Sequence, residues 1–399
     1  ETFALRFTGT LDVEAFRAAL CDVVQRHESL RTTFPAGANG PVQAIIPAEA
    51  AMPDLHVSPT TEAALSRDIE AAAEYAFDIS SEVPVRYSLF RLSPQQHVLA
   101  VVFHHIVADG SSMIPLTHDL ALAYNARCKG EPTRWPTPTL QYADFSLYEA
   151  ERLGSPEDAT SLAAIQLDFW RRNLAGLPEE TELPRDRPRP QSLSTRGSDV
   201  PFRFPRQLHE RLLTIGGENQ ASLFMILQAG MAILLSRLGA GTDVPFGSPI
   251  TARGQAGQDS VGLFVNTVVL RTDVSGNPDF RQLLVRVRDN NLAVYANLDL
   301  PFEAVVANIN PPRAVNRHPL FQMMLVVQPR QRISAQMNGI SVAHDPVRVR
   351  AARFDLTLNV ANIQEDGTPQ GVEGYLSYAV DLFDRETVEA LAGRLVRVL

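Results

Sequence analysis

Residues 103–112 have the sequence FHHIVADGSS. Several groups that could donate or accept a proton lie close together in this stretch. Two adjacent histidines, His104 and His105, are followed by Asp109 and Gly110. A neutral imidazole accepts a proton near neutral pH, because its unperturbed pKa is about 6.5. The carboxylate stands at the exit of an expected strand, where it could cap the following helix or pair with an arginine. The stretch is therefore a candidate acid–base site.

The residues before the histidines predict a buried strand. The segment VRYSLFRLSPQQHVLAVVFHH (residues 85–105) reads as a hairpin with its turn at SPQQ. Both faces of its second half are apolar, which is typical of a central strand covered on two sides. Because neighbouring side chains on a strand point in opposite directions, we expect His104 and His105 on opposite faces. The alternative interpretation is two buried, hydrogen-bonded histidines with no chemical role.

We expect no metal at these histidines. Neither belongs to an H-x-x-x-H pair, and adjacent strand positions do not converge on one ion. Cys21 and Cys128 are the only cysteines in the chain. Two isolated thiols offer no cysteine-based zinc cluster and are typical of a protein of the reducing cytoplasm.

Length, composition and charge narrow the class of protein. The chain has 399 residues, 45% of them hydrophobic and 20% charged, with a formal net charge of −9. A chain of this length is expected to form two lobes. It has no basic block, so nucleic acid is not an expected partner. The most apolar run, residues 222–238, is broken by Gln228 and Arg237 and predicts a buried helix, so we expect no membrane partner.

A change of composition at residues 177–200 predicts a linker. This segment, LPEETELPRDRPRPQSLSTRGSDV, is rich in proline, arginine, serine and glutamate. Patterns of strands and helices precede and follow it. We therefore predict an N-terminal lobe over residues 1–176 and a C-terminal lobe over residues 201–399, in an α/β or α+β arrangement.

Six segments together resemble the condensation domains of nonribosomal peptide synthetases, members of the chloramphenicol acetyltransferase-like superfamily. HHIVADG resembles the HHxxxDG motif of the family, and its part from His105 to Gly110 matches the HxxxDG of the superfamily. Five more segments follow in the family's order: RHESLRTTF (26–34), YADFSLY (142–148), VGLFVNTVVLR (261–271), NLDLPFE (297–303) and NRHPLFQ (316–322). An opening segment normally precedes ETFALRF, so we expect part of the N-terminal lobe to be missing from this sequence.

The resemblance implies a fold and a reaction. The fold is two acetyltransferase-like lobes in a V-shaped pseudodimer with a central tunnel, and a loop at about residues 249–267 crosses under it. The reaction is peptide bond formation between two acyl groups, each held on the 4'-phosphopantetheine arm of a donor or an acceptor peptidyl carrier protein. No directly bound cofactor is implied. The implied partners are these carrier proteins and an adenylation domain of the same synthetase, in antibiotic or siderophore biosynthesis.

The resemblance also assigns roles to the residues of the motif. His105 is implied to face the tunnel, and His104 to be structural. Gly110 would allow a close approach of the backbone and offer its N–H to an oxyanion. Asp109 is expected to form a scaffold ion pair. Three arginines are candidates for ion pairs in the scaffold. Arg26 and Arg31 are candidate partners of Asp109, and Arg253 is a candidate brace of the crossing loop. Candidate tunnel or substrate contacts are Ser111, Ser112 and Asn266, the last with a satisfied strand-end amide as its alternative.

Two other functions stay open. Epimerisation domains of the same fold carry a GEGHGR-like segment with a glutamate base, whereas residues 205–225 read PRQLHERLLTIGGENQASLFM. Catalytically silent docking domains usually lose the second histidine of the motif, whereas His105 is present. The segments HHIVADGSSMIPLTHDLALAY and RHESLRTTF are most similar to the subclass that joins an L-configured donor to an L-configured acceptor.

Overall fold

The computed structural model describes residues 1–38, 40–136, 140–254, 257–312, 314–329, 334–345, 351–365 and 368–399. The chain divides into two compact units, each built on a six-stranded sheet with helices. Unit 1 comprises Glu1–Arg152, Thr251–Val265 and Arg332–Val349. Unit 2 comprises Leu153–Ile250, Asn266–Gln331 and Arg350–Leu399. The predicted two-lobed α/β class is therefore confirmed.

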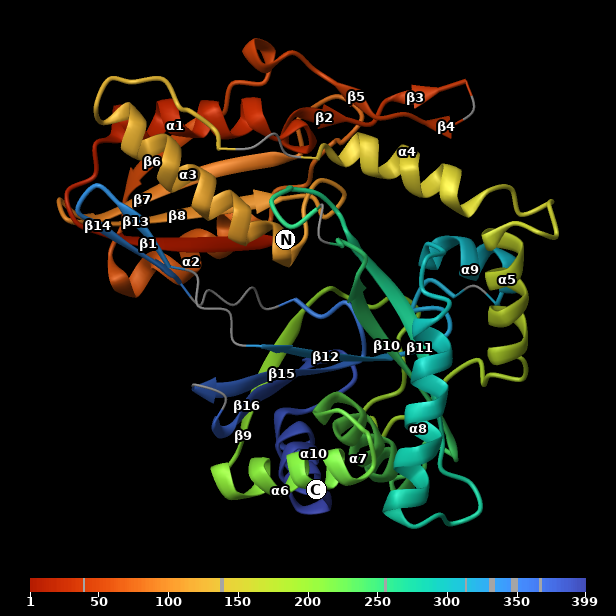
Figure 1. Cartoon of the computed structure of the whole chain (residues 1–399). Helices are drawn as coiled ribbons and strands as arrows, with labels where there is room; N and C mark the ends of the chain where they lie inside the picture. Colours follow the sequence, from red (N-terminus) through yellow and green to blue (C-terminus); the bar gives the residue numbers. More distant parts are fainter. Residues whose placement is uncertain are drawn as a thin grey trace. The chain divides into compact units, whose positions relative to one another are not determined.

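The sheet of unit 1 has the strand order β13-β14-β1-β8-β7-β6 (Figure 1). Neighbouring strands are antiparallel except β6 and β7, which run parallel. The six strands are, in the order of the sheet, Ser334–Met337, Ile340–His344, Thr2–Thr8, Gln96–Phe103, Val85–Ser93 and Leu55–Pro59. The predicted hairpin before the histidines is thus formed by β7 and β8.

Helices cover both faces of this sheet (Figure 1). The helices α1 (Val13–Arg26) and α3 (Met113–Arg127) lie on one face, and α2 (Glu62–Ala73) lies on the other. In β8, Leu99 belongs to the core beneath α1 and α3, whereas Val98 belongs to the core beneath α2. The strand is buried on both sides, as its apolar sequence predicts.

The smaller elements of unit 1 lie around this sheet. Two short hairpin-like pairs and one further helix complete it: β2 (Thr32–Thr33) with β5 (Ala44–Ile45), β3 (Ala36–Gly37) with β4 (Gly40–Pro41), and α4 (Tyr142–Leu153). Three 3₁₀ turns, η1 (Glu28–Arg31), η2 (Ala48–Ala50) and η3 (Gly110–Ser112), join the larger elements. The turn η3 lies inside the histidine motif.

The sheet of unit 2 has the order β11-β10-β12-β15-β16-β9 (Figure 1). The strands β10, β12 and β15 are parallel, and β16 and β9 extend the sheet in antiparallel fashion. The strands are, in the order of the sheet, Val265–Asp273, Asp243–Thr251, Met323–Pro329, Leu356–Glu365, Thr368–Ala379 and Gly197–Phe204. Its helices are α5 (Leu162–Asn173), α6 (Arg206–Glu218), α7 (Leu223–Arg237), α8 (Phe280–Tyr295), α9 (Phe302–Ile309) and α10 (Arg385–Val398).

The apolar segment at residues 222–238 forms α7, and this helix belongs to the core of unit 2. Within the described part of the chain, no single helix has the length and apolar character to cross a membrane. The helices α6 and α7 reach that measure only as a pair, and a bend of 102° separates them.

The boundary of the first unit differs from the predicted one. The first stretch of unit 1 ends at Arg152 and not at residue 176, because α5 packs into unit 2. Its buried residues Ala163, Leu167 and Trp170 join the hydrophobic core of that unit. The indole N–H of Trp170 also donates to the carbonyl of Asn297 (3.0 Å).

The segment at residues 177–200 is not a solvated linker. Arg189 donates through Nη1 to Asp355 (2.9 Å) and through Nε to Glu180 (3.0 Å), and its side chain is only 7% exposed. The N–H of Thr181 donates to the side chain of Gln322 (2.7 Å). The composition of the segment suggested exposure, but the buried pair of Arg189 with Asp355 holds it against the rest of unit 2.

Two later segments of the chain belong to unit 1. Residues 251–265 supply most of the predicted crossing loop, of which residues 255–256 lie outside the described part. The strand β14 pairs with β1 (Leu5 opposite His344), so part of the chain after residue 330 completes the first sheet. Unit 1 is therefore assembled from three stretches that are distant in sequence.

Burial makes the stability of the fold sensitive to mildly acidic pH. Loss of hydration is the largest cause of a lowered pKa at five histidines: His27, His97, His209, His318 and His344. A lowered pKa means that the unfolded state binds more protons than the folded state below the unfolded value of about 6.5. The free energy of unfolding should therefore fall as the pH drops below this value, before carboxylates begin to titrate.

We expect thermal unfolding followed between pH 7 and pH 5 to give a falling Tm. His27 is 1% exposed, and its Nε2 contacts Asp119 (2.8 Å), which also pairs with Arg26. His27→Gln should flatten the slope, whereas His56→Gln, at an exposed position, should leave it unchanged. Equal slopes for the wild type and His27→Gln would show that His27 does not contribute.

Candidate active site

The two histidines lie just beyond the strand that leads to them. β8 ends at Phe103, and His104 to Val107 form a turn before η3. The N–H of His104 donates to the carbonyl of Pro84 (3.0 Å). The expected separation of the two side chains by strand alternation does not apply, because regular alternation stops one residue before His104.

The turn fixes the chemical form of His105. Its Nδ1 lies 2.9 Å from the carbonyl oxygen of Ala108. A carbonyl oxygen only accepts hydrogen bonds, so Nδ1 carries the proton, and the lone pair of the neutral ring is on Nε2. The side chain is 30% exposed. In the neutral form of His105, Nε2 is therefore the nitrogen that can take up a proton.

His104 has a different environment. Its side chain is exposed, and its Nδ1 accepts the N–H of Ile106 (3.2 Å). This contact shapes the turn locally. The structural role that the resemblance implies for His104 stays a prediction, and the described contact is within the turn.

Asp109 is an enclosed charged residue of the motif. It is 1% exposed, and both of its carboxylate oxygens are occupied. Oδ1 accepts from Nη2 of Arg253 (2.8 Å) and from the N–H and hydroxyl of Ser112 (2.9 Å each). Oδ2 accepts the N–H of Phe264 (3.0 Å). The carboxylate thus links the turn to a segment more than 140 residues later in the chain.

Arg253, the partner of Asp109, is also buried. Its side chain is 8% exposed. Nη1 donates to the carbonyls of Gly257 (2.8 Å) and Ser260, and Nη2 donates to Asp109 and to the hydroxyl of Ser112 (2.9 Å). The guanidinium also lies 4.2 Å from the ring centre of Phe264. Arg253 therefore closes its own segment and ties it to the histidine turn.

The other two candidate arginines do not reach Asp109. Arg26 donates to Asp119 (2.7 Å), beside the buried His27. Arg31 donates to the carbonyl of Ile46 (2.7 Å) and to the carboxylate of Glu28 (3.2 Å). The predicted pairing of Asp109 with one of them is wrong, because proximity in the motif RHESLR does not indicate which acid an arginine faces.

The serines of the motif have structural surroundings. Ser112 is fully buried and forms a capping box with Asp109 at the start of η3. Its hydroxyl also accepts the N–H of Gly262 (3.2 Å). The expectation that Ser112 contacts substrate is therefore wrong. Ser111 is half-buried, whereas Gly110 is exposed, and a Cβ at Gly110 would meet no atom within 4 Å.

Asn266 belongs to unit 2, and its amide is saturated there. Its nitrogen donates to the carbonyls of Leu298 (2.8 Å) and Leu300 (2.7 Å). Its oxygen accepts the N–H groups of Thr267 (2.8 Å) and Phe302 (3.1 Å). The alternative of a satisfied strand-end amide describes these contacts, and the expected substrate contact stays a prediction.

Sequence reasoning missed the role of two aromatic residues and one glycine. Tyr142 packs edge-on against Phe264 (ring centres 5.4 Å apart). A Cβ at Gly262 would lie 2.5 Å from Cδ2 of Tyr142, so only glycine fits between the two rings. Both motifs, YADFSLY and VGLFVNT, were visible in the sequence, but nothing in it indicated that they pack on each other.

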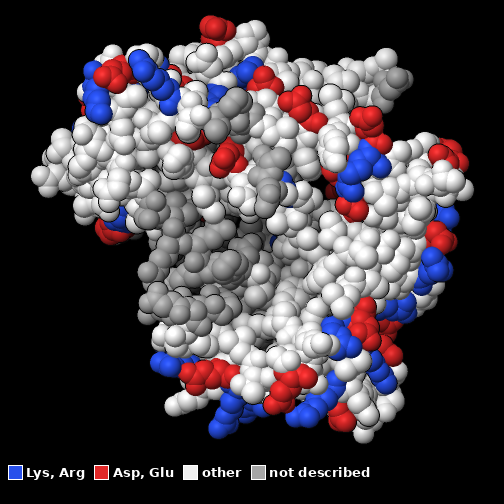
Figure 2. Space-filling model, in the orientation of Figure 1, with Lys and Arg blue, Asp and Glu red and all other residues white. Residues whose placement is uncertain are grey.

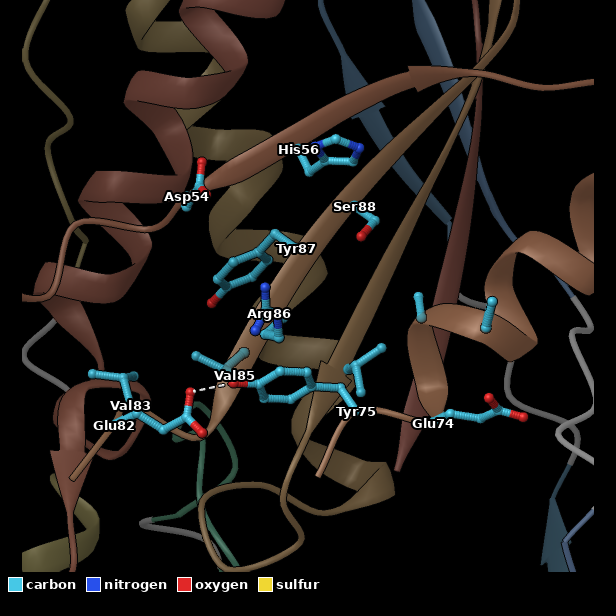
Figure 3. Close-up of a pocket in the computed structure, with 13 residues that line it drawn as sticks. Asp54, His56, Glu74, Tyr75, Glu82, Val83, Val85, Arg86, Tyr87 and Ser88 are labelled. Atoms are coloured by element: carbon cyan, nitrogen blue, oxygen red, sulfur yellow. Dashed lines mark hydrogen bonds between the residues drawn. The ribbon is translucent and has the colours of Figure 1, made fainter. Parts of the chain in front are cut away.

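A pocket of about 760 Å³ lies beside the segment whose carbonyl accepts the His104 N–H (Figure 3). Its lining includes Val83 and Val85, which flank the proline that accepts the His104 N–H. In it Tyr75 donates to Glu82 (2.9 Å), and Arg86 lies 3.9 Å from the centre of the Tyr75 ring. The carboxylates of the lining are Asp54, Glu74 and Glu82. Three carboxylates and one arginine disfavour an anionic ligand such as a phosphate.

Charges and potential metal ligands are scattered on the surface. On the face drawn in Figure 2, acidic and basic residues are interspersed without a block of one sign. In the ranges that the structure describes, no three His, Cys, Asp or Glu residues are grouped so that they could hold a metal ion.

The buried ion pair gives a direct test of its structural role. Asp109→Asn would leave Arg253 buried beside a neutral amide, and breaking a buried pair costs about 3–5 kcal/mol. We expect urea unfolding to report a loss of this size, and Asp144→Asn, at an exposed position on α4, to report none. An unchanged free energy of unfolding together with lost activity would instead place Asp109 in a proton path.

Several solved structures are similar to this chain along its whole length. The X-domain from teicoplanin biosynthesis is 37% identical, with a TM-score of 0.93, over 100% of this chain and 89% of that one. A complex of that X-domain with OxyB gives a TM-score of 0.92. A four-domain nonribosomal peptide synthetase is 20% identical, with a TM-score of 0.86, over 100% of this chain and 30% of that one. The last comparison establishes the shared fold only.

Sequence relatives identify the family. A dimodular nonribosomal peptide synthase of Bacillus subtilis is 48% identical over 99% of this chain and 17% of its own length. An isonitrile lipopeptide synthase of Mycobacterium tuberculosis is 41% identical over 99% of this chain and 16% of its own length. The chain thus spans less than a fifth of the length of either relative. The family model for condensation domains matches residues 1–399, and the chain therefore belongs to the condensation-domain family of nonribosomal peptide synthetases.

Proposed function

We propose that this chain forms a peptide bond between two acyl groups that carrier proteins present on phosphopantetheine arms. The α-amine of the acceptor attacks the thioester carbonyl of the donor, the C–N bond forms, and the C–S bond breaks. The observation that carries the proposal is the form of His105, whose Nδ1 donates to Ala108 and whose accessible Nε2 bears the lone pair. A base in that form suits the loss of a proton from an attacking amine.

The reaction requires the protein only to position the two reactants and to provide one proton acceptor. An α-amine has an unperturbed pKa of about 7.7–8.0, so roughly a tenth is neutral at pH 7. A thioester is already activated, so neither a metal nor a protein nucleophile is required. Alignment of two tethered reactants can lower the barrier by about 7–11 kcal/mol. His105 would take a proton from nitrogen, and the backbone N–H of the exposed Gly110 would stabilise the carbonyl oxygen.

The arrangement of unit 1 supports this assignment. The turn that carries His105 is clamped by Asp109, Arg253 and Ser112, none of which has an accessible polar group left for substrate. These contacts hold the histidine at a fixed position, and its Nε2 stays accessible. We also propose that the acyl groups enter through a tunnel and that the partners are donor and acceptor carrier proteins and an adenylation domain.

The subclass is part of the proposal. The segments around His105 and in RHESLRTTF are most similar to domains that join an L-configured donor to an L-configured acceptor. Donors of both configurations, loaded in parallel on carrier protein, test this, and faster condensation of the D-configured donor would contradict it.

We expect His105→Ala to lower the rate of condensation by roughly 10²–10⁴, because it removes the proton acceptor. The Tm should change little, since the side chain is partly exposed. His104→Ala is the matched control, because it removes an exposed imidazole from the same turn and should keep most of the activity. The assay is mass spectrometry of the thioester product from two loaded carrier proteins. A fully active His105→Ala variant would contradict the assignment.

A docking domain is the second candidate function. The complex of the teicoplanin X-domain with OxyB is a similar structure bound to another protein, which favours this alternative. The two functions differ in their need for open space at the turn. Only an enzyme needs room for a pantetheine arm beside His105, whereas either protein binds its partners on its outer surface.

Gly110→Trp separates these two functions. The position is exposed and a Cβ meets no atom within 4 Å, so the variant should fold. We expect it to abolish condensation and to leave carrier-protein binding, measured by calorimetry, nearly unchanged. Binding without any product from the unsubstituted chain, across several loaded pairs and in a form extended upstream of Glu1, would favour the docking domain.

A further inference from the structure

The carboxylate of Glu1, the residue just before β1, lies beside Nε2 of His105. Oε1 of Glu1 is 3.8 Å from Nε2 of His105. Both side chains are partly exposed, the glutamate to 40% and the histidine to 30%. Glu1 was not among the residues that the sequence singled out, because it belongs to no motif.

The backbone fixes Glu1 at this position. Its nitrogen donates to the carbonyl of Phe103 (2.9 Å), and the N–H of Phe103 donates back to the carbonyl of Glu1 (3.0 Å). Such a reciprocal pair places the two Cα atoms opposite each other and their side chains on the same face of the sheet. His105 lies in the turn just beyond Phe103. The pairing that places Glu1 opposite Phe103 therefore holds the backbone of Glu1 next to this turn.

The distance suits a third group between the two side chains. A separation of 3.8 Å is longer than a hydrogen bond, for which donor and acceptor lie about 2.7–3.2 Å apart. One nitrogen placed between Oε1 and Nε2 can reach both at hydrogen-bond distance. Because Nδ1 is committed to Ala108, Nε2 can only accept from such a group while the ring is neutral. A site with one anionic and one neutral acceptor matches a protonated amine.

We propose that Glu1 and His105 together bind the α-ammonium group of the acceptor, so that Glu1 is a second catalytic residue. The proposal rests on the proposed function of the chain and names the group that recognises the amine. Glu1 favours the charged amine, and His105 accepts the proton that must leave before the attack.

The protons balance in this scheme. The ammonium nitrogen carries three protons, and the nitrogen of the product amide carries one. The first proton passes to Nε2 of His105 and gives the free amine, which then attacks the thioester carbonyl. The C–S bond breaks, and the departing thiolate takes up a proton from the imidazolium to become a thiol. The second proton of the nitrogen leaves through the regenerated Nε2 to solvent.

The test compares ligands that differ only in the amine. L-alanyl-pantetheine carries an α-ammonium group at pH 7, whereas L-lactyl-pantetheine carries a hydroxyl group in its place. The unsubstituted chain should bind the first more tightly by roughly tenfold or more, because hydrogen bonds to charged groups are the stronger ones. Glu1→Gln keeps the size of the side chain and should abolish this preference. Glu1→Asp should restore part of it.

Two controls and a kinetic readout complete the experiment. Glu49→Gln removes an exposed carboxylate from the same unit and should keep the full preference. In condensation assays, Glu1→Gln should raise the KM for the acceptor carrier protein and leave the KM for the donor unchanged. A loss that is purely structural would lower the Tm and affect both ligands equally, and this outcome would overturn the proposal.

The remaining outcomes separate this proposal from the proposed function. An unsubstituted chain that makes peptide bonds, together with a Glu1→Gln variant of unchanged ligand preference, would overturn the role of Glu1 alone. An unsubstituted chain that makes no product with cognate loaded pairs would overturn the proposed function. The ligand preference in binding would then still decide whether Glu1 recognises an ammonium group.

Discussion

The buried contact between Asp109 and Arg253 is the constraint on which the geometry of unit 1 depends. Taking two charges out of water is costly, and the cost is offset here by hydrogen bonds to both carboxylate oxygens of Asp109 and from both terminal nitrogens of Arg253. The carboxylate receives four of them, and the guanidinium donates to two carbonyls besides. These bonds hold the histidine turn against residues 253–264. The position of His105 therefore depends on contacts that His105 itself does not make.

Local sequence patterns predict the secondary structure around the site. The apolar residues on both faces of residues 97–103 predicted a central strand, and β8 covers this segment. Such signals depend on neighbours within one or two turns of the chain. The end of β8 one residue before His104 was not visible, because a strand's end depends on which partner strand still pairs with it.

Long-range partners were beyond the reach of the sequence. Arg26, Arg31 and Arg253 were all recognised as candidates for ion pairs, but only the fold selects Arg253 for Asp109. Asn266 is a second residue whose long-range partners the sequence did not indicate. Its motif suggested a substrate contact, yet four backbone groups of unit 2 take up its amide. A polar residue in a conspicuous motif has as many structural partners available as chemical ones, and its type does not distinguish them.

The assembly of unit 1 from three stretches of chain has a consequence for the exchange of domains between synthetases. A recombinant that takes residues 1–152 from one parent and the rest from another would combine an Asp109 and an Arg253 that never evolved together. It would also pair β1 of one parent with β14 of the other. Fusion points that respect compactness must therefore carry residues 251–265 and 334–345 along with the N-terminal half. Contiguity in sequence is a poor guide to where such a protein can be cut.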